Sequence, residues 1–249
     1  MILVIGELGK DVFMYGKCDR ICPEAPVPIF NPILGAYVTN VRVPSVDADI
    51  EEMIDEGIHV VIAAGNNYHK IESLGGVDYD NYAVTNAGTI FYHRGSSPYS
   101  PEAHIVGNID SEVHSGGLEQ KAESSEAGPG VSIFAPGTNI MSSVSQTNTY
   151  DPNSGPYPDD TDFKITNLSG TSMAAPQVAG VISFYLQLNP TATPAQVKAF
   201  IESTANTQQI YETGLNNDYT DTRSLYGAED RYLFNKFNSA VRLLLGSGS

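Results

Sequence analysis

Basic residues are scarce in this sequence. Its 249 residues include 13 Lys and Arg against 29 Asp and Glu, which gives a formal net charge of −16. Proteins that bind nucleic acid use Lys and Arg to displace counterions from the phosphates, so this balance argues against a nucleic-acid partner. Apolar residues are not scarce. At 41% of the chain they are enough for a sizeable core, and the length suits one large domain or two small ones.

Long apolar runs and cysteines are also lacking. No stretch approaches the roughly eighteen consecutive apolar residues of a membrane-spanning helix, which argues against a membrane partner. No basic segment precedes the apolar N-terminal residues, so we expect no secretory signal there, and the localisation stays open. The two cysteines, Cys18 and Cys22, lie together in a Pro-rich stretch. Two thiols without further ligands make no metal site, so we interpret them as free thiols, with a disulfide or metal role as the alternative.

The order of helical and strand patterns in the middle of the chain predicts the fold class. Residues 45–57 carry apolar side chains on one helical face, with Ser45 as the expected N-cap and Gly57 as the expected C-cap, and the apolar strand 59–66 follows directly. This order is typical of α/β proteins, so we predict a mostly parallel sheet with helices on both faces. Other expected strands are 2–6, 36–43, 89–94, 103–109, 131–137 and 139–146, and other expected helices are 173–190 and 193–205.

Composition also predicts which segments are buried and which are exposed. The helix expected over 173–190 is apolar on all sides, so we predict that it is buried, with Pro176 in its first turn. Thr193 is the expected N-cap of the next helix. The stretch 147–162 is rich in Pro, Asp and Asn and is predicted to be an exposed insertion. We divide the chain into an N-terminal strand and extended arm (1–32), a main domain (33–205) and a C-terminal extension with a flexible tail (206–249).

The string NLSGTSMAAPQVAG, residues 167–180, places Ser172 at the start of the long apolar helix. A Ser at this position is either an ordinary helix cap or a nucleophile. For the second role, the helix N-terminus offers backbone N–H groups without helical partners, which stabilise negative charge on a neighbouring oxygen. Gly170 lets a substrate approach the backbone closely, and the two Ala residues after Met173 leave little bulk beside the hydroxyl.

The whole string resembles the nucleophile motif of the subtilisin-like serine proteases, Gly-Thr-Ser-Met-Ala-x-Pro-His-Val-Ala-Gly. Two further segments resemble that family in the same order: VVIAAGNN at 60–67 and VSIFAPGTNIMSS at 131–143. The resemblance spans about residues 45–205. Within the family the chain looks most like the variant found in structural proteins of tailed phages, which would place it in the phage particle or the host cytoplasm.

The resemblance implies a serine endopeptidase and assigns roles to four residues. Ser172 would be the nucleophile, and Asn66 would donate to the oxyanion of the tetrahedral intermediate. Ala64 and Gly65 would line the pocket for the substrate residue before the scissile bond. A peptide or protein is therefore the expected substrate, provided that the chain is active.

The sequence lacks two of the family's catalytic motifs. The motifs that carry the catalytic Asp and His, Asp-x-Gly and His-Gly-Thr-x-Val-Ala, should precede Asn66, but neither is present, and only His59 precedes it. Gln177 also replaces a family His, which is not the catalytic one. Because a Ser hydroxyl without a positioned base is a poor nucleophile at neutral pH, we expect this chain to hydrolyse peptides weakly or not at all. Its fold would be subtilisin-like without the first strands.

The alternative function is a catalytically inactive subtilase fold that serves as a structural or interaction module. Loss of the first strands would leave an apolar sheet edge open to self-association or to a partner strand, unless residues 2–6 and 36–43 fill the gap. We expect no cofactor. Calcium is common in the family, and the acidic loops 77–82 and 151–162 hold candidate ligands, but their spacing fits no calcium-binding pattern and solvated loops are the alternative interpretation.

Residues 1–32 resemble a different family. The stretch ILVIGELGKDVFMYGKCDRICPEAPVPIF is similar to the opening of ribokinase-like heptose-phosphate kinases, and this resemblance implies that Asp11 would contact sugar hydroxyls. Nothing downstream resembles the ATP site or the Gly-x-Gly-Asp motif of those kinases. We therefore interpret the segment as a strand and an extended arm joined to a partial subtilisin-like domain.

Overall fold

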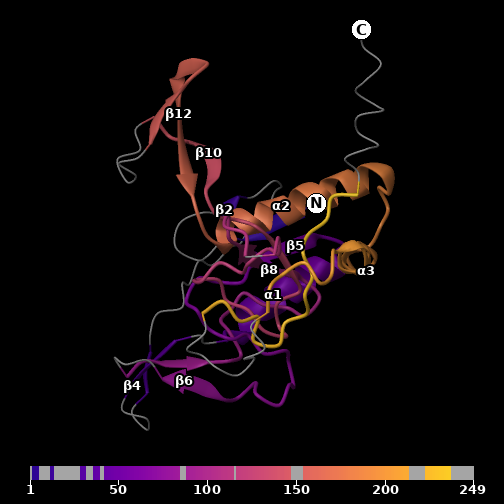
Figure 1. The fold of residues 1–249 in the computed structure, drawn as a ribbon. Coiled ribbons are helices and arrows are strands. Elements are labelled where there is room, and N and C mark those ends of the chain that lie inside the picture. Colours follow the sequence, from indigo (N-terminus) through magenta and orange to yellow (C-terminus); the bar gives the residue numbers. More distant parts are fainter. Residues whose placement is uncertain are drawn as a thin grey trace.

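The computed structural model describes residues 42–84, 88–114, 116–146, 154–212 and 222–236, together with the strand backbones 2–5, 12–13, 29–31 and 36–39. Within these residues the chain forms one five-stranded sheet with helices against it and two smaller sheets (Figure 1). No helix in the described ranges is long and apolar enough to cross a membrane.

The central sheet is mostly parallel, as predicted. Its strand order is β2-β1-β5-β8-β9, where β1, β5, β8 and β9 run parallel and β2 runs antiparallel to β1. The backbone of residues 2–5 thus fills the place beside β5, which confirms the prediction of a parallel strand there. The bounds are β1 Ile2–Ile5, β2 Val12–Phe13, β5 His59–Ala63, β8 His104–Ile109 and β9 Ile133–Pro136.

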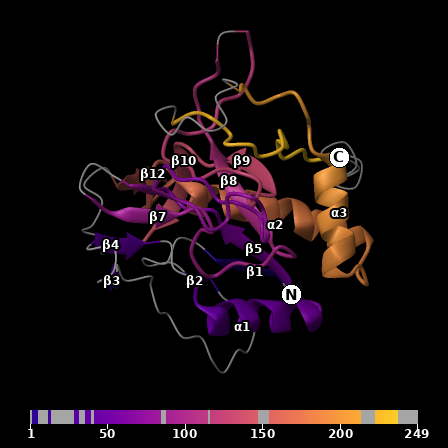
Figure 2. The ribbon, with the colours of Figure 1, turned by 90° about the horizontal axis from the view of Figure 1, so that it is seen from below.

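Helices cover both faces of this sheet. Successive side chains of a strand point to opposite faces, and every residue of β5 and β8 is buried, which requires cover on both faces. Val61 and Ala63 pack with α2 (Thr171–Leu188) and α3 (Pro194–Thr204). Val60 and Ile62 pack on the other face with α1 (Pro44–Asp55). In Figure 2, α1 and α2 lie on opposite sides of β1 and β5. The predicted α/β architecture is confirmed.

Two expected features of the helix starts are wrong. Helix α1 begins at Pro44 with Val43 as its N-cap, and Ser45 lies inside it, because a Pro with its fixed φ suits the first helical position. Gly57 was expected as the C-cap, but Glu56 is the C-cap, and Gly57 with φ of +82° follows it and ends the helix. Helix α2 begins at Thr171, so Pro176 lies in the second turn, where it cannot donate to the Ser172 carbonyl.

The predicted burial of α2 holds for one face only, since Pro176 and Gln177 are exposed even in its first half. Ala174, Val178 and Ile182 are fully buried, whereas Leu188 near the C-terminal end is 55% exposed. In its last turn Tyr185 stacks on Phe200 of α3, with ring centroids 4.2 Å apart, so the apolar contacts there come from α3 and cover one side only.

The N-terminus of α3 carries the capping box that Thr193 predicts. The Thr193 hydroxyl accepts from the Gln196 N–H at 3.3 Å, and the Gln196 side chain accepts from the Thr193 N–H at 2.9 Å. Thr193→Ala should lower the free energy of unfolding by about 1 kcal/mol, measured by urea denaturation. Thr191→Ala, an exposed Thr two residues earlier, is the control and should change stability little. Equal losses in the two variants would contradict the capping role.

Two smaller sheets flank the central one. The first has the order β3-β4-β7-β6 and includes the expected strand 89–94 as β7 (β3 Ile29–Asn31, β4 Ala36–Thr39, β6 Tyr82–Val84, β7 Ile90–Tyr92). The stretch 36–43 was one of two alternatives for filling the gap in the central sheet, but its strand β4 pairs with β3 and β7 instead.

The second small sheet projects from the body as a hairpin just before α2 (Figure 1). Its order is β10-β12-β11, with β10 Ile140–Val144, β11 Gly155–Tyr157 and β12 Asp160–Leu168. The stretch 147–162 was predicted to be an exposed insertion, with no strand assigned to it. Its described part, from residue 154, instead forms β11 and the start of β12, and both are mostly exposed as predicted. Alternating Thr, Phe and Ile in 161–165 favour this strand.

The outer edge of β9 is covered by the chain itself. Phe134 N–H donates to the Arg231 carbonyl at 2.8 Å, and Leu233 N–H donates to the Phe134 carbonyl at 2.8 Å. Leu225 and Tyr226 of the same C-terminal region are buried in the core with α1. On this side the sheet therefore presents no open edge at Phe134.

Candidate active site

Asn66 and Ser172 come from segments that the fold brings together. Asn66 lies just beyond the carboxyl end of β5, and Ser172 lies in the first turn of α2. The Thr171 N–H donates to Asn66 Oδ1 at 3.0 Å, and the Gly65 N–H donates to Thr171 Oγ1 at 3.1 Å. These two hydrogen bonds fix the Asn66 side chain against the N-terminus of α2. Because Oδ1 accepts from Thr171, the amide nitrogen is the end that can donate to a bound oxygen.

The absence of a side chain at Gly170 leaves room for the Asn66 side chain at the N-terminus of α2. Its φ of +148° is one that L side chains rarely adopt, and a Cβ there would lie 3.3 Å from Asn66 Nδ2. The Gly170 N–H donates to the Gly137 carbonyl at 2.8 Å, and the Gly170 carbonyl accepts from Ala174 N–H at 3.3 Å. A side chain at this position would both strain the backbone and crowd the Asn66 amide.

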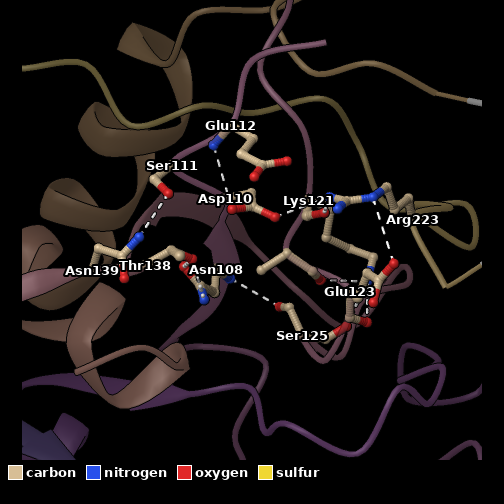
Figure 3. Close-up of polar contacts among 11 residues, drawn as sticks. Asn108, Asp110, Ser111, Glu112, Lys121, Glu123, Ser125, Thr138, Asn139 and Arg223 are labelled. Carbon is tan, nitrogen blue, oxygen red and sulfur yellow. Dashed lines mark hydrogen bonds and ion pairs between the residues drawn. The ribbon is translucent and has the colours of Figure 1, made fainter. Parts of the chain in front are cut away.

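A buried amide supports the turn beneath Gly170. Asn108, at the carboxyl end of β8, is 1% exposed and donates from Nδ2 to Thr138 Oγ1 at 3.2 Å (Figure 3). A Cβ on Gly137 would lie 2.5 Å from Asn108 Oδ1 and 2.7 Å from the Gly170 carbonyl oxygen. Sequence reasoning missed Asn108, although a polar residue inside the apolar strand HIVGNI was a signal, because buried amides need defined partners.

The two residues expected to line a substrate pocket follow β5. Ala64 is partly buried and packs against the core, and Gly65 has φ of +119°. A Cβ on Gly65 would lie 2.8 Å from the carboxyl carbon of Glu126, whose N–H donates to the Gly65 carbonyl at 2.9 Å. Side-chain atoms of Glu126 therefore fill one side of Gly65. A cavity of about 700 Å³ lies elsewhere, at the amino end of β5, and is lined by His59, among others.

His59 and His104 lie far from the proposed nucleophile along the strands. They begin β5 and β8, so they lie at the amino ends of these strands, whereas Asn66 lies beyond the carboxyl end of β5. Both rings are buried, and burial lowers the pKa of each. For His104, burial and then the nearby Lys198 charge lower the pKa to about 3. Both rings are therefore neutral at neutral pH.

His93 is bonded to a carboxylate. His93 Nδ1 lies 2.8 Å from Asp78 Oδ2, and Lys70 Nζ contacts the same oxygen at 2.9 Å. Burial lowers the pKa of His93 more than the Asp78 charge raises it. Burial alone would raise the pKa of Asp78, but hydrogen bonds from Asn81 and Lys70 and the neighbouring positive charges lower it to about 2. The carboxylate thus belongs to an ion cluster that joins the loop between β5 and β6 to His93, which follows β7.

The remaining two histidines stack on aromatic rings. The His69 and Phe91 ring centroids are 3.7 Å apart, and those of His114 and Tyr211 are 3.6 Å apart. Burial lowers the pKa of His69 to about 4, with a further contribution from the His93 charge. Stacking or an ion pair thus holds three of the histidine rings, whereas the buried Nδ1 atoms of His59 and His104 make no hydrogen bond among the described residues.

The loops considered for calcium are engaged in other contacts where they are described. In 77–82, Asp78 belongs to the ion cluster and Asp80 pairs with Arg94 at 3.2 Å. From 154 to 162 the chain forms the hairpin. Across the described ranges, no three His, Cys, Asp or Glu side chains come together as metal ligands. Cys18, Cys22 and Asp11 lie outside the described residues.

Comparison with known families gives one match over most of the chain. The model of the Subtilase family (peptidase S8) matches residues 11–228. The match begins inside the segment 1–32 that resembles a sugar kinase. Neither that resemblance nor the phage variant is supported by the matches.

Curated proteases are similar over about two thirds of the chain. The alkaline extracellular protease of Yarrowia lipolytica is 36% identical over 176 residues, which are 69% of this chain and 31% of that protein. Alkaline serine exoprotease A of Vibrio alginolyticus is 30% identical over 169 residues, 68% of this chain and 24% of that protein. The chain thus spans less than a third of the length of these two relatives.

A solved structure shares the fold. The crystal structure of a cold-adapted subtilisin-like serine proteinase superposes with a TM-score of 0.51 and 24% sequence identity, covering 78% of this chain and 50% of that one. The likeness supports a common architecture of parallel sheet and helices.

Proposed function

The chain belongs to the subtilase family, a family of serine proteases, and from this premise we propose that it carries the nucleophile and oxyanion half of a subtilisin-like endopeptidase site. Ser172 is the nucleophile in this proposal, and Asn66 is the oxyanion donor. Ala64 and Gly65 form one wall of the pocket for the residue before the scissile bond. The substrate is a peptide or protein.

The observation that carries the proposal is the pair of hydrogen bonds between the Asn66 segment and Thr171. These bonds hold the Asn66 side chain at the N-terminus of α2, where Ser172 follows Thr171. Negative charge is stabilised at a helix N-terminus. Ser172 Oγ would attack the carbonyl carbon of the scissile bond. The oxyanion that forms would accept hydrogen bonds from Asn66 Nδ2 and from the Ser172 N–H. A donor of this kind contributes about 100- to 1000-fold in rate, a magnitude measured in a subtilisin itself.

We further propose that this chain by itself hydrolyses peptides weakly or not at all. Its sequence lacks both family motifs for the catalytic Asp and His. The positions of its histidines support the same view. His59 and His104 lie at the amino ends of β5 and β8, away from Asn66, and His93 belongs to the Asp78 cluster. Without the Asp and His that these family motifs supply, the Ser172 hydroxyl is a poor nucleophile at neutral pH.

Labelling by a fluorophosphonate probe tests both parts of the proposal. The expected result is slow, substoichiometric labelling at neutral pH that disappears in Ser172→Ala and persists in Ser169→Ala, the matched control three residues earlier. Rapid stoichiometric labelling that is lost only in Ser172→Ala would contradict the inactivity. Labelling that survives in Ser172→Ala would contradict the assignment of the nucleophile.

A catalytically inactive subtilase fold that acts as an interaction module is the second candidate, and the missing motifs favour it. In this case the proposed contact is self-association or strand pairing at the edge of the central sheet beyond β1 and β2. Size-exclusion chromatography with light scattering should then show concentration-dependent dimers. A stable monomer at all concentrations would argue against self-association.

A further inference from the structure

We propose that the Lys121 ammonium is a built-in cation in a cage of main-chain carbonyls, that the cage without this side chain binds a free monovalent cation, and that the cage positions the segment carrying Asn66. The proposal concerns a residue that neither the sequence motifs nor the proposed reaction uses.

The cage is formed by the turn that follows Lys121. The side chain is 0% exposed, and Nζ donates to the carbonyl oxygens of Ser125 at 2.8 Å, Ala122 at 3.0 Å and Glu123 at 3.3 Å. An ammonium has three N–H donors, and three carbonyls face it. Figure 3 shows Lys121 beside Glu123 and Ser125 in this turn. Satisfied donors are what make a buried charge tolerable in a protein interior.

Main-chain carbonyls around a single positive charge form the type of site that holds potassium in proteins. Ammonium and potassium carry the same charge and are similar in size. The ring of Tyr226, with its centroid 5.9 Å from Nζ, adds a π face on a further side. The carbonyl dipoles of the turn point inward in either case, so they need a cation there to stay together.

The caged turn makes hydrogen bonds on both sides of Asn66. The Glu126 N–H donates to the Gly65 carbonyl at 2.9 Å, and the Tyr68 N–H donates to the Ser124 carbonyl at 3.0 Å. Ser125 Oγ also accepts from the Asn108 N–H at 2.9 Å (Figure 3). The cation thus fixes the turn, and the turn fixes the backbone that carries the proposed oxyanion donor. Only this last consequence rests on the proposed function, because the cage itself does not depend on it.

The start of the turn is fixed separately. Arg223 Nη1 donates to the Lys121 carbonyl and contacts Asp110 Oδ2, each at 3.1 Å (Figure 3). The Lys121 backbone therefore keeps its place when its side chain is shortened, which leaves the carbonyl cage available to an added ion.

The test is the thermal unfolding of Lys121→Ala at constant ionic strength in potassium, ammonium, methylammonium or tetramethylammonium chloride. We expect the variant to unfold at a lower temperature than the wild type in tetramethylammonium, which is too large for the cage. The smaller cations should restore the unfolding temperature, with a gain that follows the binding isotherm of a single site. The wild type should not distinguish these cations.

Lys198→Ala is the matched control, because Lys198 Nζ donates to one carbonyl, that of Ala103 at 2.8 Å, and pairs with Glu202 at 3.0 Å. It should show no preference among the cations. Hydrogen exchange reports the effect on the site: the Tyr68 and Glu126 amides should exchange faster in Lys121→Ala and slow again with potassium. This readout is independent of Ser172 labelling, so the cage and the proposed protease site can fail separately.

Three results would overturn the proposal: the same response of Lys121→Ala to potassium and tetramethylammonium, a Lys121→Met variant as stable as the wild type, or unchanged exchange at Tyr68 and Glu126. If Lys121→Ala does not fold in tetramethylammonium, the refolding yield in potassium against tetramethylammonium replaces the unfolding temperature. A yield that does not depend on the cation then overturns the proposal as well.

Discussion

Replacing Gly128 by alanine should lower the free energy of unfolding by about 4 kcal/mol, the combined cost of backbone strain and overpacking. Gly128 has φ of +123°, and a Cβ there would lie 2.4 Å from the carbonyl oxygen of Ile71. That oxygen already accepts from the Gly130 N–H at 2.9 Å. The two backbone segments cannot separate without losing this bond and the Ile71 N–H bond to Ala127 at 2.7 Å. Chemical denaturation of the purified variant measures the loss.

Gly57→Ala is the control for this prediction. Gly57 also has a positive φ, +82°, but nothing lies within 4 Å of a Cβ at that position. It should therefore cost only about 1 kcal/mol, the strain of the left-handed conformation. Equal costs at Gly57 and Gly128 would show that strain alone acts and that the predicted clash with Ile71 is absent.

The second large effect is a loss of stability in mild acid that depends on His104. Its pKa in the folded protein is about 3, lowered by burial and by the Lys198 charge from the ordinary value of 6.5. The unfolded chain therefore binds this proton more readily than the folded protein. The stabilising contribution is complete above pH 6.5 and falls as the pH drops toward the folded pKa. At pH 5 the loss is about 2 kcal/mol relative to pH 8.

His104→Gln should remove about 2 kcal/mol of the loss between pH 8 and pH 5, because glutamine does not titrate. The measurement is the free energy of unfolding at several pH values between 8 and 5 in both proteins, compared as slopes so that any constant cost of the substitution cancels. His69, with a pKa of about 4, contributes a loss of similar size over this range, so a comparable residual slope remains in the variant. Identical slopes in the wild type and His104→Gln would rule out the assignment to His104.

Sequence patterns predicted helices and strands well where interactions between neighbouring residues in the chain set them. The apolar run 59–66 became β5, and Thr193 with Gln196 forms the capping box, because neighbouring residues alone set these features. At α1 the local signal that decides is Pro44, whose fixed φ suits the first helical position, so that Val43 and not Ser45 is the N-cap. The hairpin strand β12 was missed because turn-forming residues around it hid its alternation.

Patterns of residues could not predict which strands become neighbours. Residues 2–5 and 36–39 both have strand-forming sequences, yet only the first pairs with β5, and the second pairs with β3 and β7. The same limit applies to Lys121 and Asn108. Nothing near them in the sequence shows that a cage of carbonyls surrounds one and that a Thr hydroxyl accepts from the other.

The sequence by itself determined the family, the order of helices and strands, and the positions of Ser172 and Asn66, because these depend on short motifs and on the periods of helix and strand. Only the tertiary structure decided that the Thr171 N–H donates to Asn66 and that Glu126 fills the space beside Gly65. It also decided that His93 pairs with Asp78 and that other histidines stack on aromatic rings. The physical reason is distance along the chain: these contacts join residues that the sequence separates widely, and they form only when the whole core packs.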